Sequence, residues 1–273
     1  FNPLFWSCRM KSAVAVLLCS LAITTPLQAQ ILPSVFLEEL TWTEVRDAVD
    51  SGTTTVIIPT AGTEQNGPHM ILGKHKFIIN EASARIAREL GNALVAPVMT
   101  YVPEGDVENP RGHLAKAGTI TLPNEYFEKV LEYAARSLAL HGFTDIVMIG
   151  DSGGNQRGME NVAEALNQEW SEHSNRVHFV GEYYSANGFQ EWLLSQGETE
   201  ETIGSHAGIR DTSQLLAVDP RHIRTNKLAQ GGGFPDSGVS GDPTRASVEY
   251  GERGLQFKVD TTVRIIRERT GSR

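Results

Sequence analysis

The chain has 273 residues and a formal net charge of −9, with 40% hydrophobic residues, 21% charged residues and two cysteines. A chain of this length and apolar content can bury a substantial core, in one large domain or two small ones. The acidic balance and the lack of a Lys/Arg cluster argue against nucleic-acid binding.

The first thirty residues predict a targeting segment. Met10 is followed by a basic residue, by the apolar run 13–23 and by the small residue Ala29, a pattern typical of a cleaved signal peptide. The run is shorter than the roughly 20 residues that span a bilayer, which disfavours a retained anchor. We expect residues 1–29 to be removed and the rest to be exported to the periplasm, without a membrane attachment. Both cysteines lie in the removed segment, so the mature chain would have no disulfide.

Strand-like and amphipathic segments alternate along the remaining chain. In chain order, the patterns predict a strand at 56–59, a helix at 81–92, a strand at 93–102, a helix at 121–143, a strand at 145–150, a helix at 159–170, a strand at 176–184 and a final helix at 257–269. This alternation is typical of a parallel sheet covered by helices on both faces, so we predict a single α/β domain over residues 30–273. A loop-like stretch at 228–244 is a candidate lid.

Polar residues gather directly after the predicted strands, where ligand sites lie in parallel sheets. Residues 62–76 read GTEQNGPHMILGKHK and follow the first strand. Glu64, His69 and His75 in this stretch are of the types that bind a divalent cation such as zinc. The same spacing also suits a capping glutamate and surface histidines.

Two further motifs follow the same rule. The turn DSGGN at 151–155 follows the strand at 145–150 and places Asp151 where a ligand or general base usually stands. The segment GSHAGIRDTSQLL at 204–216 offers His206 as a general acid or base beside Asp211. In each motif the acidic residue could instead be a plain helix cap.

Taken together, these motifs resemble the creatininase (creatinine amidohydrolase) family. The resemblance covers roughly residues 40–268 and rests on EQNGPH with a following LGKH, GTITLP, HGFTDIVMIGDSGGN, SHAGIRDTS and GDPTRAS. It implies a three-layer α/β/α fold with a mainly parallel sheet, a metal-dependent amidohydrolase site at the strand ends, and often a hexamer.

The resemblance also implies roles for single residues. Glu64 matches the family's first metal ligand, whereas Asn66, His75 and Ser152 replace a histidine, an aspartate and a histidine of the family's ligand set. His206 matches the acid/base histidine. We therefore expect one divalent ion, zinc or alternatively manganese, with Glu64 also counted as catalytic and with these ligands: Glu64, His75, Asp151 and Asp211.

The expected substrate is a small or cyclic amide, hydrolysed by metal-activated water with His206 as proton shuttle. Creatinine is not expected, because EETIGS at 200–205 lacks the aromatic residue that creatinine-hydrolysing members carry there. We expect the substrate pocket to include Asn66, His69, His113, Ser152, Gly153 and Asn155. The alternative is a non-catalytic small-molecule binder on the same scaffold with a degraded metal site.

Overall fold

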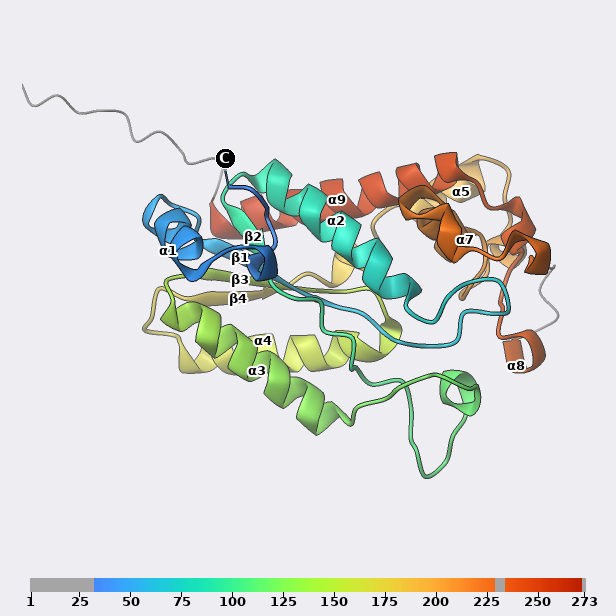
Figure 1. Cartoon of the computed structure of the whole chain (residues 1–273), viewed down its shortest axis with the longest axis horizontal. Coiled ribbons are helices and arrows are strands. Elements are labelled where there is room, and N and C mark those ends of the chain that lie inside the picture. The colour runs from blue at the N-terminus through green and yellow to red at the C-terminus, as the bar shows by residue number, and fades with distance from the viewer. Residues whose placement is uncertain (1–31, 229–233, 272–273) are drawn as a thin grey trace, which may run out of the picture.

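The computed structural model describes residues 32–228 and 234–271 (Figure 1). The predicted signal segment 1–29 and residues 229–233 of the loop-like stretch lie outside the described residues. Within the described ranges, no helix has both the length and the apolar character that crossing a membrane requires.

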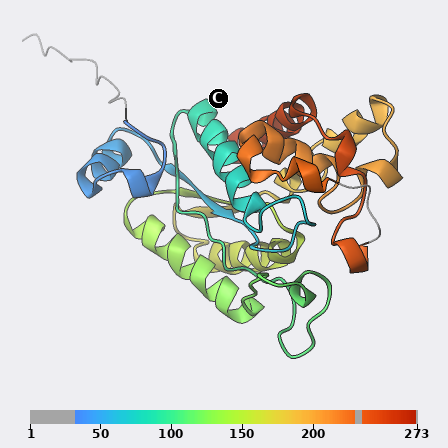
Figure 2. The ribbon, with the colours of Figure 1, turned by 45° about the vertical axis from the view of Figure 1, so that its right-hand side comes forward.

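A four-stranded parallel sheet forms the centre of the fold. Its order is β2-β1-β3-β4, and its strands are β1 (Thr55–Thr60), β2 (Ala93–Val95), β3 (Asp145–Gly150) and β4 (Arg176–Phe179). The carboxyl ends of the strands therefore lie at one edge of the sheet, and the loops that follow β1 and β3 leave there side by side (Figure 2).

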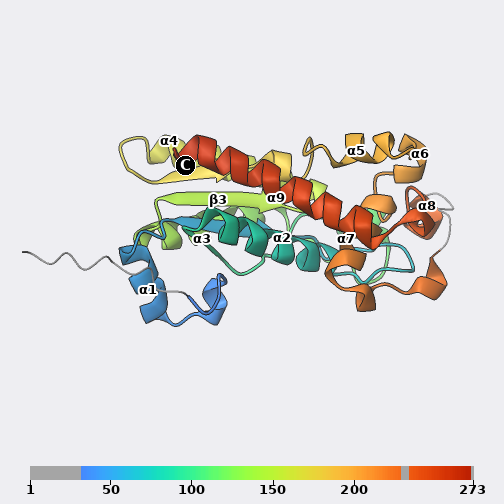
Figure 3. The ribbon, with the colours of Figure 1, turned by 90° about the horizontal axis from the view of Figure 1, so that it is seen from above.

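Helices cover both faces of this sheet. On one face lie α2 (Lys74–Leu90) and α9 (Val248–Thr270), with α7 (Ile209–Val218) packed against both; on the other lie α3 (Asn124–Leu140) and α4 (Gln156–Glu169) (Figures 1 and 3). The three-layer α/β/α prediction is thus confirmed. The remaining α-helices of the described residues are α1 (Trp42–Asp50), α5 (Phe189–Ser195), α6 (Glu200–Ile203) and α8 (Phe234–Ser237).

The central strand shows why the sheet is covered twice. Every residue of β1 is buried. Val56 and Ile58 pack in the apolar cluster of α3 and α4, whereas Ile57 packs in the cluster of α2 and α9. Successive side chains of a strand point to opposite faces, so a strand that is buried throughout has a helix layer on each side.

Four elements differ markedly in extent from the predictions: α2, α9, β2 and β4, the last of which was predicted over 176–184 but ends at Phe179. Helix α2 begins at Lys74, not at residue 81, because polar residues occupy the buried face of its first turn and hide its periodicity. Helix α9 begins at Val248, nine residues before the predicted start, because Gly251 interrupts the helical sequence pattern. A glycine is required at this position, since a Cβ would lie 1.9 Å from the carbonyl oxygen of Ser213. Strand β2 ends at Val95, two residues before a proline that cannot donate a ladder hydrogen bond.

Candidate functional site

A pocket of about 660 Å³ opens at the carboxyl edge of the sheet. The loops after β1 and β3, the start of α2, and helices α7 and α9 all contribute to its wall. Of the residues expected at the site, the pocket is lined by Glu64, His75, His113, Asp151, Ser152, Gly153, His206 and Asp211.

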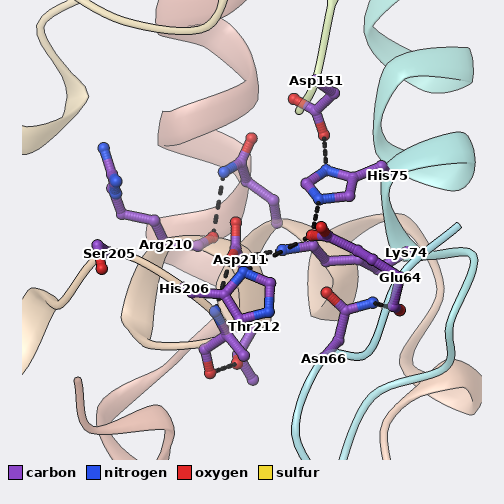
Figure 4. Close-up of polar contacts among 12 residues, drawn as sticks. Glu64, Asn66, Lys74, His75, Asp151, Ser205, His206, Arg210, Asp211 and Thr212 are labelled. Atoms are coloured by element: carbon purple, nitrogen blue, oxygen red, sulfur yellow. Dashed lines mark hydrogen bonds and ion pairs between the residues drawn. The ribbon is translucent and has the colours of Figure 1, made fainter. Parts of the chain in front are cut away.

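Glu64, His75 and Asp151 form one continuous hydrogen-bonded line. Nε2 of His75 lies 2.7 Å from Oε1 of Glu64, and Nδ1 lies 3.0 Å from Oδ2 of Asp151 (Figure 4). All three side chains are buried. Both ring nitrogens of His75 are therefore occupied by carboxylates, so the imidazole bridges two acids.

Two buried lysines pair with aspartates of the site, one at the Asp151 end of this line and one beside it. Nζ of Lys258 contacts Oδ1 of Asp151, and Nζ of Lys74 lies 2.5 Å from Oδ2 of Asp211. Burial alone would raise the pKa of both aspartates, but the neighbouring lysine and the charge of His75 together outweigh burial and lower the pKa of each. Three cationic groups and three carboxylates thus lie together in the site.

The central histidine is held in its charged form. Burial and the charge of Lys74 lower the pKa of His75, but Glu64 and Asp151 overcome both and raise it to about 9. Burial raises the pKa of Glu64, but His75, together with the charge of Lys74, lowers it more strongly, so it lies well below its ordinary value. The pair is an imidazolium and a carboxylate at neutral pH.

Glu64 also faces two imidazoles from distant parts of the chain. Nδ1 of His113 lies 3.5 Å from Oε2 of Glu64, and Nδ1 of His206 lies 3.6 Å from Oε1. One donor atom from each of the three residues lies within 4.8 Å of the others. The group therefore has the composition and compactness of a metal-ligand set.

The hydrogen bonds of the two histidines define their tautomers. Nε2 of His206 lies 2.9 Å from the carbonyl oxygen of Gln65, which can only accept, so Nε2 carries the proton. Oε1 of Gln65 accepts from the N–H of Gly67, so its Nε2 donates to Nδ1 of His113 at 3.1 Å. In both rings Nδ1 is thus an acceptor that faces the Glu64 carboxylate.

Both histidines are neutral in this setting. Burial, followed by the charge of Lys74, lowers the pKa of His206 to about 3. Burial also lowers the pKa of His113. Neutral imidazole is the form that binds a metal ion.

Glu104 is a second carboxyl group beside Glu64, and the sequence analysis missed it. Oε1 of Glu104 accepts a hydrogen bond from Oγ of Ser152 at 2.9 Å, and the residue lines the pocket. Burial, followed by the Glu64 carboxylate, raises the pKa of Glu104 to about 8. The Glu104 carboxyl group can lie here only because residue 62 is a glycine, since a Cβ on Gly62 would lie 2.1 Å from Oε1 of Glu104.

The other expected pocket residues, Asn66, His69 and Asn155, are buried but are not among the pocket-lining residues. The side-chain amide of Asn66 donates hydrogen bonds to the carbonyl oxygens of Glu64 and Ile71 and so stabilises the loop in which it lies. Nε2 of His69 lies 3.0 Å from Oγ1 of Thr212, which ties the same loop to α7. Asn155 donates to Thr60 between β3 and β1.

Three cations of the pocket were also missed: Lys74, Lys258 and Arg210. A signal existed for Lys258, since it falls on the same helical face as Leu255, Val259 and Thr262, where a lysine needs a buried partner. Lys74 stands next to His75 in LGKHK but looked like a loop residue. Nothing in the sequence distinguished Arg210 or Glu104 from surface charges.

Comparison with known sequences places these residues in context. A family model described as creatininase, creatinine amidohydrolase, matches residues 38–266. A mycofactocin precursor peptide peptidase of Mycolicibacterium smegmatis is 24% identical over 220 residues, covering 72% of this chain and 78% of the relative. A creatinine amidohydrolase of Pseudomonas putida is 25% identical over 206 residues, covering 71% and 76%.

Solved structures agree with the fold. A manganese creatininase superposes with a TM-score of 0.75 at 23% identity, covering 86% of this chain and 98% of that one. A mutant creatininase of the Zn-Zn type superposes with a TM-score of 0.71, also at 23% identity and with the same coverage. At this level of identity the likeness establishes the architecture.

Proposed function

The chain belongs to the creatininase family, and from this premise we propose that its pocket hydrolyses the C–N bond of an amide with the help of one divalent metal ion. Amide cleavage is the chemistry that joins the names of the two relatives, a peptidase and an amidohydrolase. The observation that carries the proposal is the convergence of three acceptors, from Glu64, His113 and His206, at the wall of one pocket.

These three residues fit a single ion. One carboxylate and two neutral imidazoles form a ligand set that zinc uses in catalytic sites, with a further position left open. Metal binding through Nδ1 of His113 would replace the hydrogen bond that this nitrogen accepts from Gln65. The backbone carbonyl of Gln65 holds the Nε2–H of His206, which is the kind of contact that orients a ligating imidazole. We propose zinc for this set, with manganese as the alternative.

A second ion does not fit the remaining acids. Asp151 and Asp211 each contact a lysine ammonium group, and His75 uses both ring nitrogens for carboxylates. In place of the ligand set expected from the sequence, we therefore propose that His75, Asp151 and Asp211 keep the pocket electrically balanced and that only Glu64 of that set binds the metal.

The protein's own groups would handle the proton. When bound, the ion would act as a Lewis acid that polarises the amide carbonyl and lowers the pKa of water. Of the four carboxyl groups that line the pocket, Glu104 is the one whose contacts are a hydroxyl and another carboxyl rather than a cation. We propose that Glu104, and not His206, transfers the proton to the departing amine nitrogen.

The test is metal analysis combined with hydrolysis of a panel of small amides. Glu64→Gln, His113→Ala and His206→Ala should each lose the metal and the activity together, while His141→Ala, at an exposed histidine, should keep both. Full activity in a metal-free protein, or a metal content unaffected by all three changes, would refute the proposal.

The charge balance of the site also supports a second candidate, a small-molecule binder without turnover. Three buried cationic groups already neutralise three carboxylates, so the pocket can remain folded without a metal ion. Ligand-induced stabilisation of a metal-free protein that hydrolyses no amide of the panel would select this candidate.

A further inference from the structure

Arg210 and Gln214 form a second polar corner of the pocket, one helical turn apart on α7. Nε2 of Gln214 donates to the backbone carbonyl of Arg210 at 3.1 Å. Its Oε1 is buried and has no hydrogen-bond partner among the described residues, although the side chain is only 3% exposed. A buried acceptor without a partner is costly, and in a pocket wall it points to a ligand that donates an N–H or O–H.

Arg210 differs from the lysines of the same pocket. Lys74 and Lys258 each contact an aspartate. Among residues 32–228 and 234–271, no carboxylate pairs with Arg210, whose side-chain contact is a long hydrogen bond of 3.5 Å from Nη1 to Oε1 of Gln190. A guanidinium has five N–H donors, so most of its capacity is available to a ligand.

We propose that Arg210 binds a carboxylate of the substrate while Oε1 of Gln214 accepts an N–H from it. The planar fork of a guanidinium matches a carboxylate in two parallel hydrogen bonds. In Figure 4, Arg210 lies across the site from His75, so the carboxylate would lie apart from the Glu64 group. The substrates are then amides that carry a free carboxylate, namely N-acyl amino acids and short peptides with a free carboxyl terminus.

The size of the pocket agrees with this class. A volume of about 660 Å³ is within the range that holds a ligand of many atoms. It accommodates an amide at Glu64 together with a second anchored group. The inference rests on the proposed amide hydrolysis for its catalytic meaning, but the binding of the carboxylate can be measured on its own.

The experiment compares matched ligands on the full-length protein as purified. Binding of N-acetylalanine and N-acetylphenylalanine is measured by calorimetry against the corresponding N-acetyl amino acid amides, which lack only the charge. The wild type should bind each acid at least about 10-fold more tightly than its amide. Arg210→Gln should abolish this preference, and Arg210→Lys should retain part of it. Gln214→Leu should weaken acid and amide by similar factors.

Arg264→Gln is the control, since it removes the same charge from an exposed arginine on α9. It should leave the preference unchanged. Equal binding of acids and amides by the wild type, no binding of either, or an unchanged preference in a folded Arg210→Gln variant overturns the inference. Hydrolysis, followed in the same samples, separates the two proposals: turnover without an acid preference refutes only the role of Arg210, and an acid preference without turnover refutes only the catalytic function.

Discussion

The ammonium nitrogen of Lys74 lies 2.5 Å from a carboxylate oxygen of Asp211, and the lysine has no exposed surface. Asp211 was expected from the sequence to bind a metal ion. In the structure, a cation of the protein's own chain takes that carboxylate instead. Lys258 stands in the same relation to Asp151. The two pairs explain how a pocket with four carboxyl groups is largely balanced by the protein's own cations, which supports the proposal of a single metal ion.

Lys74→Met should destabilise the fold by about 3–5 kcal/mol, because it leaves the Asp211 carboxylate in the site without its cation. The double variant Lys74→Met/Asp211→Asn should recover a large part of this loss, since the uncompensated charge is gone. Urea denaturation of both variants and of the Asp211→Asn single variant measures the coupling. Additive effects of the two changes would show that the pair does not act as a unit.

Glu104→Gln should lower kcat by about 100-fold or more and leave the metal content unchanged, because the amide can still accept from Ser152 but cannot exchange a proton. Steady-state kinetics and metal analysis on the same samples give both numbers. A variant with wild-type kcat would remove Glu104 from the reaction.

Gly62→Ala should produce a similar loss of kcat without removing any catalytic group. The new Cβ would lie 2.1 Å from Oε1 of Glu104 and force that carboxyl group out of place. Shortening the displaced side chain in Gly62→Ala/Glu104→Asp should restore part of the activity. Gly73→Ala is the matched control in the same loop, because its Cβ would meet nothing closer than 3.9 Å. Equal activity of the Gly62 and Gly73 variants would contradict the assignment.

His69 should make the fold sensitive to acid. Burial, followed by the charge of Lys74, lowers the pKa of His69 to about 4, whereas the unfolded chain takes up this proton near pH 6.5. Between these values the unfolded state binds more protons, so the stability falls as the pH falls from about 6.5 to 4. Relative to His69→Gln, the wild type should lose on the order of 2 kcal/mol over this window.

Urea denaturation of both proteins at several pH values checks the difference. His141→Gln, at an exposed histidine, should follow the wild type throughout. A constant difference between wild type and His69→Gln from pH 7 to pH 4 would be inconsistent with a buried neutral ring.

The sequence predicted the architecture well because its strongest signals are physical and local. Strand β3 was predicted with its exact bounds, since an apolar run of six residues between turn signals has few alternatives. The predicted starts of α2 and α9 were wrong for one shared reason. Their first turns carry buried polar residues or glycines, so they lack the apolar periodicity from which a helix is predicted. These residues line the site or allow close helix packing.

The site was predicted only in part. Motif order pointed to Glu64, His75 and Asp151, which do lie together, with His75 hydrogen-bonded between the two carboxylates. Their protonation and their partners depend on Lys74 and Lys258, and a lysine's partner cannot be read from its own neighbours in the chain. Glu104 lies in a long connection with no regular pattern, so only the folded chain brings it beside Glu64.

The most direct test of the account is the number and position of metal ions in crystals of the protein grown with excess zinc, located by anomalous scattering. The account predicts one ion per chain, contacting Glu64, His113 and His206, with Lys74 and Lys258 still paired to their aspartates. Two ions, or one ion bound by His75 and Asp151, would contradict it.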